Sequence, residues 1–251
     1  MKILNVVEHR PWPLPQNRAI MIQTWHDLLF AHWSVPADIL KDKIPAGVEL
    51  DTFDGKAWLG IIAFQLSDVR LNGIRAVPWV SNFPEVNVRT YVTHGGKPGV
   101  FFLSLDADNP LGIALAKPWF RLNYYRAQIE IKSQNCGIDF RSRRIQKGAP
   151  PAQFEASYRP CSPTFRARPG SLEAWLTERY CYYTGPRDAD EGQLYRCEIH
   201  HPPWRLQMAQ ATICSNTNTL ALSHGIDLPA TAPLLHYARK MQALIWSLRR
   251  C

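Results

Sequence analysis

Polar and apolar side chains alternate at almost every position in the segment FPEVNVRTYV, residues 83–92. Successive residues of a β-strand point to opposite sides of the sheet, so a strand here sorts its side chains by face. One face carries Glu85, Asn87, Arg89 and Tyr91. The other carries Val86, Val88, Thr90 and Val92. Because a glutamate and an arginine are costly to bury without partners, the first face is expected to meet either water or a polar site.

The segment NYYRAQIEIKS, residues 123–133, repeats this alternation. Its polar face carries Tyr124, Arg126, Gln128 and Glu130. Residues two apart on a strand are separated by about 6.6 Å and residues four apart by about 13 Å, so Glu85 and Arg89 cannot pair along their own strand. Each of them needs a partner from a neighbouring strand.

Similar apolar or alternating runs predict further strands, with short helices between some of them. The predicted strands cover 57–71, 99–108, 137–145, 152–160, 194–202 and 206–214, and a strand is favoured over a helix at 234–250. Residues 18–35 form two strand-like apolar runs that are interrupted by the polar pair His26 and Asp27. Helices are predicted where a proline or a capping side chain begins an apolar segment: at 36–44, at 109–118 and at 171–183.

The number and shortness of these elements indicate a fold rich in strands. Twenty prolines are spread along the chain, which favours stiff turns rather than long helices. A chain of 251 residues can form one large domain, and no internal repeat, low-complexity segment or long linker divides it. The prediction is therefore a single domain over residues 1–251.

The formal net charge of +8 raises the question of a nucleic-acid partner. In the densest basic zone, RSRR at 141–144 leads into a turn and a second strand, which predicts a hairpin with a solvated, charged face. Net charge informs association more than identity, so a nucleic-acid partner is disfavoured. No apolar run is long enough to span a bilayer and the N-terminus lacks a signal peptide's features, so we expect no membrane partner and a soluble, cytoplasmic protein.

Familiar catalytic signatures are absent, including the G-x-S-x-G elbow, the phosphate loop, the dinucleotide fingerprint and the H-E-x-x-H helix. The six cysteines are irregularly spaced without C-x-x-C and are expected to be reduced thiols. No cofactor and no metal site is predicted. His26 with His32, and His200 with His201, are explained as hydrogen-bonded or partly exposed histidines, and His26 is kept as a candidate ligand-binding residue.

A cavity forms if the polar faces of both alternating segments line the interior of a barrel. The side chains that would converge there are Glu85, Asn87, Arg89, Tyr124 and Arg126. They supply a carboxylate, guanidinium groups suited to a carboxylate ligand and a phenol, which are parts for acid-base chemistry on an acidic compound. A solvated outer face or a buried ion-pair network is the alternative, and the residues alone leave both open.

Several longer segments together resemble the YqjF-like family, a domain of unknown function, through nearly the whole chain. They are RPWPLPQ at 10–16, the run 24–64 that begins TWHDLLFAHWSV, FPEVNVRTYV, GVFFLSLDA at 99–107 and PLLHYARKMQALIWSLRR at 233–250. The resemblance implies no established activity. It does imply a fold like that of acetoacetate decarboxylase: a single α+β domain whose curved, mainly antiparallel sheet forms a barrel or cone around a central cavity, with a few short helices. This favours an inward-facing Glu85.

The remote similarity to acetoacetate decarboxylase also implies site positions. The cavity glutamate of that enzyme aligns with Glu85, and its Schiff-base lysine lies in a stretch that aligns with NYYRA, where Tyr124 and Tyr125 stand. A phenol cannot form the iminium that a lysine amine forms, and Lys117 falls at the end of a predicted helix rather than on the strand. Schiff-base decarboxylation is therefore not expected. A weaker alignment of an Asn-Arg pair adds Arg18 as a ligand-binding candidate.

Two functions are compatible with such a cavity. In the first, an enzyme acts on a small acidic or carbonyl-bearing organic compound without a covalent amine intermediate. Glu85 is then the general acid or base, Arg89 and Arg126 hold a carboxylate or enolate, and Tyr124 donates a hydrogen bond. In the second, a ligand-binding or sensor domain uses the cavity without chemistry. The partner in both is a small molecule, and assembly into a homo-oligomer is left open.

Overall fold

The alternating segments of the sequence become the strands of one sheet in the computed structural model. The structure describes residues 2–110, 112, 119–134, 137–186, 192–214 and 219–251. The strands are β1 Met21–Val35, β2 Glu49–Leu50, β3 Ala57–Leu71, β4 Phe83–His94, β5 Lys97–Ala107, β6 Tyr124–Gln134, β7 Gly137–Arg144, β8 Gln153–Pro160, β9 Cys181–Thr184, β10 Tyr195–His200, β11 Gln207–Ile213, β12 Leu234–Ile245 and β13 Arg249–Arg250. The α-helices are α1 Ala37–Lys41, α2 Pro78–Ser81 and α4 Leu172–Thr177, and 3-10 turns occur at Lys2–Asn5 and Leu222–His224.

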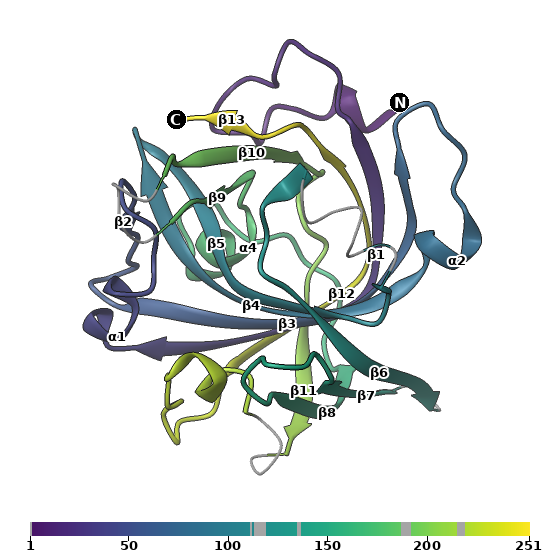
Figure 1. Cartoon of the computed structure of the whole chain (residues 1–251), viewed down its shortest axis with the longest axis vertical. Coiled ribbons are helices and arrows are strands. Elements are labelled where there is room, and N and C mark those ends of the chain that lie inside the picture. The colour runs from purple at the N-terminus through teal and green to yellow at the C-terminus, as the bar shows by residue number, and fades with distance from the viewer. Residues whose placement is uncertain (1, 111, 113–118, 135–136, 187–191, 215–218) are drawn as a thin grey trace.

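Seven of these strands close into a ring. Going around it, β12 pairs with β1, β1 with β3, β3 with β4, β4 with β5, β5 with β9, β9 with β10, and β10 again with β12. The β5–β9 pairing is parallel and the others are antiparallel. Figure 1 shows the molecule viewed approximately along the axis of this ring. The predicted curved, mainly antiparallel sheet is confirmed.

The remaining long strands form a flap on the outside of the ring. Strand β6 pairs with β5 in parallel through residues 124–126 only and then continues with β7, β8 and β11, which returns to β12. These four strands lie below the ring in Figure 1. Strands β1, β3 and β4 are therefore covered by protein on both sides, which is why most of their residues are buried.

Most predicted strands agree with the structure. The strand predicted at 57–71 is β3 with the same ends, and the C-terminal segment is the strand β12, as favoured. The polar interruption predicted within 18–35 is a β-bulge: the register shifts between His26 and Leu29, and Asp27 has a φ of 53°. A bulge bends a strand while its pairing continues, so β1 stays one strand.

The predicted helices are shorter in the structure, and the last part of one of them is a strand. Ser171 caps α4 through a hydrogen bond from the Ala174 N–H to its Oγ, as expected, but the helix ends at Thr177. Residues 181–184 instead form β9, because β5 and β10 offer pairing on both sides of this Cys-Tyr-Tyr-Thr segment. Helix α1 ends at Lys41 rather than at residue 44. The helix predicted at 109–118 lies mostly outside the described residues.

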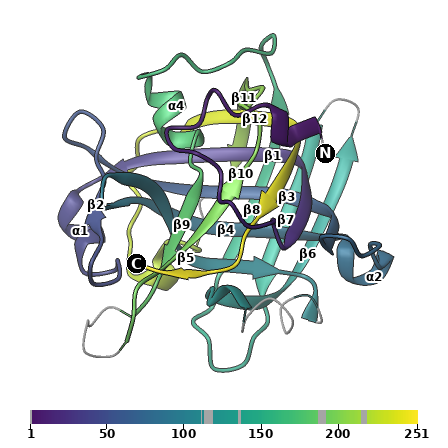
Figure 2. The same ribbon diagram turned by 90° about the horizontal axis from the view of Figure 1, so that it is seen from above.

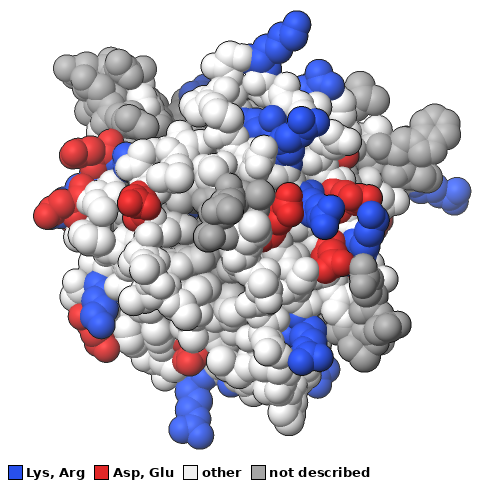
Figure 3. Space-filling view, turned by 90° about the horizontal axis from the view of Figure 1, so that it is seen from below, with Lys and Arg blue, Asp and Glu red and all other residues white. Residues whose placement is uncertain are grey.

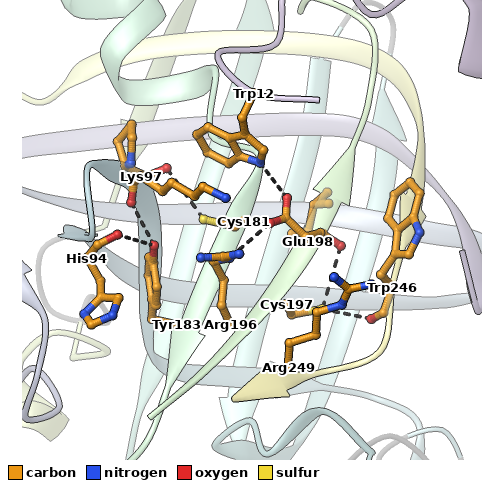
Figure 4. A network of polar contacts seen from close by, with 12 residues as sticks. Trp12, His94, Lys97, Cys181, Tyr183, Arg196, Cys197, Glu198, Trp246 and Arg249 are labelled. Atoms are coloured by element: carbon orange, nitrogen blue, oxygen red, sulfur yellow. Dashed lines mark hydrogen bonds and ion pairs between the residues drawn. The ribbon is translucent and has the colours of Figure 1, made fainter. Parts of the chain in front are cut away.

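The N-terminal segment is fastened to the outside of the ring at β10. Glu198 is 4% exposed and accepts hydrogen bonds from Trp12 Nε1 at 2.8 Å, Arg10 Nη2 at 3.2 Å and Arg196 Nε at 3.0 Å. Figure 4 shows Trp12 and Arg196 meeting this carboxylate from two sides. Such a buried carboxylate with three donors joins the first residues of the chain to the barrel wall.

Candidate functional site

The polar face of β4 lines a cavity inside the seven-stranded ring. The cavity has a volume of about 400 Å³, and Glu85, Asn87 and Arg89 all lie in its wall. Every strand of the ring contributes lining residues. Tyr124, at the start of β6, reaches the same space. The sequence pattern did not decide whether the Glu85 face of β4 meets water or a polar site. In the structure this face is part of the wall of a cavity.

Glu85 is a buried carboxyl group with two neutral hydrogen-bond donors. It is 4% exposed; Asn87 Nδ2 donates to Oε1 and the Tyr124 hydroxyl donates to Oε2, both at 3.4 Å. Desolvation raises the pKa of Glu85 to about 7, the Asp106 charge adds to the rise, and the two hydrogen bonds oppose it. Near neutral pH this carboxyl is present in both protonation states, which is the condition for a general acid or base.

Tyr124 is the proton donor of this pair. Burial raises its pKa well above the usual value, and the neighbouring Glu85 charge raises it further. The phenol is therefore neutral and can give a hydrogen bond either to Glu85 or to an oxygen of a bound molecule.

Arg89 lies at the end of the cavity that helix α4 closes. Helix α4 is in the upper part of Figure 2. Its Nη2 donates to the Leu176 carbonyl at 3.1 Å, and its guanidinium lies 5.8 Å from the centre of the Phe30 ring. Its Nε is buried and has no hydrogen-bond partner. Carbonyl and ring contacts leave the positive charge of Arg89 without a carboxylate among the described residues.

A second arginine, Arg179, reaches the same end of the cavity and was not predicted from the sequence. It is 6% exposed, pairs through Nη1 with Asp51 Oδ2 at 2.6 Å and donates from Nε to the Trp175 carbonyl at 2.6 Å. Its Nη2 is buried without a partner. Tyr91 lies between the two arginines, 5.7 Å from the guanidinium carbon of Arg89 and 5.0 Å from that of Arg179.

The closed end of the cavity therefore carries more positive than negative charge. Two guanidinium groups meet one carboxylate, that of Asp51, and two of their N–H groups are unsatisfied. Asn87 adds a buried, unpartnered Oδ1 nearby on β4. Because both guanidinium groups line the cavity, their excess positive charge would attract an anionic ligand.

A buried histidine supports this end of the cavity from behind. The His32 ring nitrogen Nε2 lies 2.7 Å from the Tyr91 hydroxyl, which donates to the Leu176 carbonyl at 3.0 Å. Burial lowers the pKa of His32 well below its usual value, and the Arg89 and His236 charges lower it further. A neutral His32 can donate from Nε2 to the Tyr91 oxygen, so the hydroxyl points at the carbonyl and the phenol ring is held between the arginines.

Three predicted site residues lie elsewhere. Arg126 is exposed and outside the cavity lining although it shares a face with Tyr124, because it is the last β6 residue paired with β5 and stands where β6 leaves the ring. Arg18 is exposed and precedes β1. His26 bonds to Ser67 Oγ at 2.7 Å and points away from the cavity, whereas its neighbour Trp25 lines it.

Neither an amine nor a metal cluster occurs in the described part of the site. No described lysine lines the cavity. Lys117, the lysine singled out in the sequence, lies outside the described residues. Among the described His, Cys, Asp and Glu side chains, no three gather closely enough to hold a metal ion.

The outer surface of the molecule mixes charges of both signs. Figure 3 shows Lys and Arg interspersed with Asp and Glu on the face that is lowest in Figure 1. On the flap, Lys132 pairs with Glu130 at 2.9 Å and Arg141 lies 3.9 Å from Glu155, while Arg144 is buried against Asp106 rather than solvated as the hairpin interpretation had it. No helix in the described part of the chain is long and apolar enough to cross a membrane.

Several solved structures share this fold at low sequence identity. Enduracididine biosynthesis enzyme MppR complexed with pyruvate matches 97% of this chain and 93% of its own, with a TM-score of 0.60 and 12% identity. An acetoacetate decarboxylase-like enzyme from Sphingomonas wittichii RW1 matches 97% of both chains, with a TM-score of 0.60 and 13% identity. Acetoacetate decarboxylase from Legionella pneumophila matches 99% of this chain and 94% of its own, with a TM-score of 0.59 and 14% identity. The fold is therefore that of acetoacetate decarboxylase-like proteins.

Sequence comparison reaches further. The uncharacterized protein YqjF of Bacillus subtilis (strain 168) is 46% identical over 237 residues, which cover 94% of this chain and 95% of that protein. The family model DUF2071, described as an uncharacterized conserved protein, matches residues 22–242. The chain belongs to the DUF2071 family, as the resemblance to YqjF implied.

Proposed function

We propose that this protein binds a small organic acid in the barrel cavity and that Glu85 exchanges a proton with it. The observation that carries the proposal is the position of Glu85: a carboxyl with a pKa of about 7, in the wall of a cavity whose closed end carries two guanidinium groups and one carboxylate. An anion is attracted by Arg89, and a carbon acid beside Glu85 can lose or gain a proton there.

The arrangement suits a carbonyl-bearing acid best. With its carboxylate near Arg89, a proton on the carbon next to the carbonyl transfers to the ionised Glu85, and the electron pair of that C–H bond moves onto the carbonyl oxygen. The Tyr124 hydroxyl is positioned to donate a hydrogen bond to the enolate oxygen, which carries the charge that develops. No lysine takes part in this step, and the acetoacetate decarboxylase-like neighbours support the fold of the cavity rather than its chemistry.

A deuterium-exchange experiment tests the proposal. Ligands are first found by thermal shift among keto acids, aromatic acids and acyl compounds, and the C–H groups next to the carbonyl of a bound keto acid are then followed by NMR in D₂O. Exchange should fall at least about 100-fold in Glu85→Gln, while Glu49→Gln, an exposed glutamate on β2, should exchange like the wild type. Unchanged exchange in Glu85→Gln rejects the assignment.

The pH dependence of this exchange follows from the raised pKa of Glu85. The reaction needs the ionised carboxylate as base, so the rate should increase with pH up to about 7 and level off above it. A rate that is flat between pH 5 and 8 argues against Glu85 as the base. Borohydride added during exchange should leave the protein mass unchanged, and a covalent adduct at any lysine contradicts the lysine-free step.

A binding or sensor domain is the second candidate. The two hydrogen bonds to Glu85 are long, 3.4 Å each, and no described lysine lines the cavity. Both observations fit a cavity that holds its ligand without transforming it. A ligand that raises the melting temperature saturably, is recovered intact and shows no Glu85-dependent exchange favours this candidate over the first.

A further inference from the structure

The cavity is larger and more apolar than a three-carbon acid requires. A volume of about 400 Å³ falls within the roughly 300–1,000 Å³ of pockets that bury drug-sized ligands. Apart from the polar face of β4, its wall is built largely from rings and aliphatic chains, including Phe30, Phe64, Phe102, Tyr182 and Trp204. A small polar ligand would leave most of this apolar surface in contact with water.

Polarity is distributed unevenly along the cavity. Arg89 and Arg179 lie at the end closed by α4. Glu85 lies four residues from Arg89 along β4. Phe83, at the other end of the strand, also lines the cavity, and six residues of strand separate it from Arg89, a distance of about 20 Å. If the charged group of a ligand binds at the arginines, the rest of the ligand therefore lies along apolar side chains of the cavity wall.

The apolar wall ends at an exposed and mainly apolar rim, where Arg70 and Arg75 also line the cavity. Leu71, Ile74, Val77 and Trp119 line the cavity and are nevertheless 37%, 56%, 53% and 55% exposed. Single exposed apolar residues are normal on a protein surface. Four of them at the opening of one cavity indicate a site that contacts the apolar part of a ligand. The rim continues the wall outward from Phe83 and Leu71, so it extends the apolar wall rather than forming a separate surface.

The charges at the closed end of the cavity suit one carboxylate. Arg89 and Arg179 together with Asp51 leave an excess of one positive charge at the closed end. Glu85 has no cation among the groups that shift its pKa, and Asp106 adds further negative potential there. A second carboxylate placed near an ionised Glu85 would be repelled by it.

Building on the proposed function, we infer that the ligand is an amphiphilic monocarboxylic acid. Its carboxylate lies against Arg89 and Arg179 in the cavity wall, and an aliphatic or aromatic tail lies along the apolar wall to the rim. Arg179 is then a ligand-binding residue, held in position by Asp51 and Trp175. The guanidinium groups of Arg89 and Arg179 line this end of the cavity and attract the carboxylate, and the tail covers the apolar wall.

A chain-length series tests this inference by calorimetry. The probes are butanoate, hexanoate, octanoate and decanoate, with pyruvate as the short keto acid and octanol as the uncharged analogue. Affinity should increase about fourfold for each added methylene until the tail reaches the rim, and octanol should bind far more weakly than octanoate. Arg89→Met should remove the difference between octanoate and octanol.

Rim variants separate the tail from the carboxylate without disturbing the folded core. Ile74→Ser and Val77→Ser should weaken decanoate binding several-fold and leave butanoate binding unchanged. Leu222→Ser is the matched control, because Leu222 is 53% exposed but does not line the cavity. It should change neither affinity.

The outcomes distinguish this inference from the proposed function. If pyruvate and butanoate bind as tightly as decanoate and depend on Arg89, the apolar-tail inference is overturned and organic-acid binding stands. If octanol binds as tightly as octanoate, the carboxylate position is wrong. If no acid of any length binds, organic-acid binding itself fails and the inference fails with it.

Discussion

The valine face and the glutamate face of β4 are separated by the thickness of one strand, yet their surroundings differ. Val86, Val88 and Val92 pack into the core shared with the flap, where Phe140 and Phe154 are fully buried. Glu85 and its neighbours on the other face line a cavity. The valine side of the strand is packed against apolar atoms, whereas the other side holds charged groups that lack partners. The first side therefore stabilises the fold, and the second side is available to bind a ligand.

Two arginines make the same contrast. Arg144, on the flap side, forms a buried bidentate pair with Asp106, with Nε to Oδ1 at 2.6 Å and Nη2 to Oδ2 at 2.7 Å. Arg89, on the cavity side, has a carbonyl partner and a buried Nε without one. The Arg144 guanidinium is fully paired within the protein, whereas the Arg89 guanidinium is available to bind an anionic ligand.

The largest expected effect compares two phenylalanines. Phe140→Ala should lower the free energy of unfolding by about 3–5 kcal/mol, because the ring is fully buried against Phe154 and its removal leaves a void. Phe102→Ala should cost less than about 2 kcal/mol, because Phe102 already borders open space. Urea unfolding of both variants measures this, and equal losses contradict the division into filled and hollow sides.

The second comparison removes one charged side chain from the packed side of the sheet and one from the cavity side. Asp106→Asn leaves Arg144 buried without its carboxylate and should lower the free energy of unfolding by about 3–5 kcal/mol. Arg89→Met should change it by about 1 kcal/mol or less, since no carboxylate partner is lost and an unsatisfied N–H disappears. A large loss in Arg89→Met means that Arg89 serves the fold rather than a ligand.

The third prediction concerns the pH dependence of stability at Glu85. Its pKa is about 7 in the folded protein against an ordinary 4.5, so the folded state holds the extra proton between these values and stability falls as pH rises through this window. Glu85→Gln removes that loss and should stabilise the protein by roughly 3 kcal/mol at pH 8 and hardly at all at pH 4. Denaturant unfolding at both pH values checks it. A uniform gain or a loss at pH 8 contradicts a costly buried carboxylate.

The smallest expected effect belongs to Asn87. Asn87→Leu removes a buried Oδ1 that has no partner but also removes the hydrogen bond to Glu85. The two changes oppose each other, so unfolding free energy should shift by no more than about 1 kcal/mol. Ligand affinity should fall several-fold, and a stability loss with unchanged binding places Asn87 in the fold instead.

Much of the fold could be predicted because alternation reports which face a side chain occupies. That reasoning placed Glu85, Asn87 and Arg89 together, and Tyr124 beside them, with the resemblance choosing the inside over the outside. Alternation does not report where a strand leaves a sheet. Arg126 shares a face with Tyr124 but is the last of the three residues that β6 pairs with β5, at the point where the strand leaves the ring. The same pattern therefore placed Tyr124 in the cavity wall correctly and misplaced Arg126, which is exposed.

Arg179 was missed for a related reason. It follows the short helix α4 and precedes β9, and its segment was expected to continue as helix to residue 183. Pairing of β9 with β5 joins residues about eighty apart, which no local pattern records. An arginine flanked by Trp175, Tyr180 and Tyr182 was the available signal, because a charge among aromatic residues is seldom left without a role.

The pKa of Glu85 tests the central claim most directly, namely that this face of β4 presents a desolvated carboxyl to a cavity. Carboxyl ¹³C NMR of glutamate-labelled protein, with the Glu85 signal assigned by its loss in Glu85→Gln, measures that pKa in the folded protein. A midpoint of about 7 is predicted. A midpoint near 4.5 would show a hydrated, ordinary carboxylate and would contradict the account.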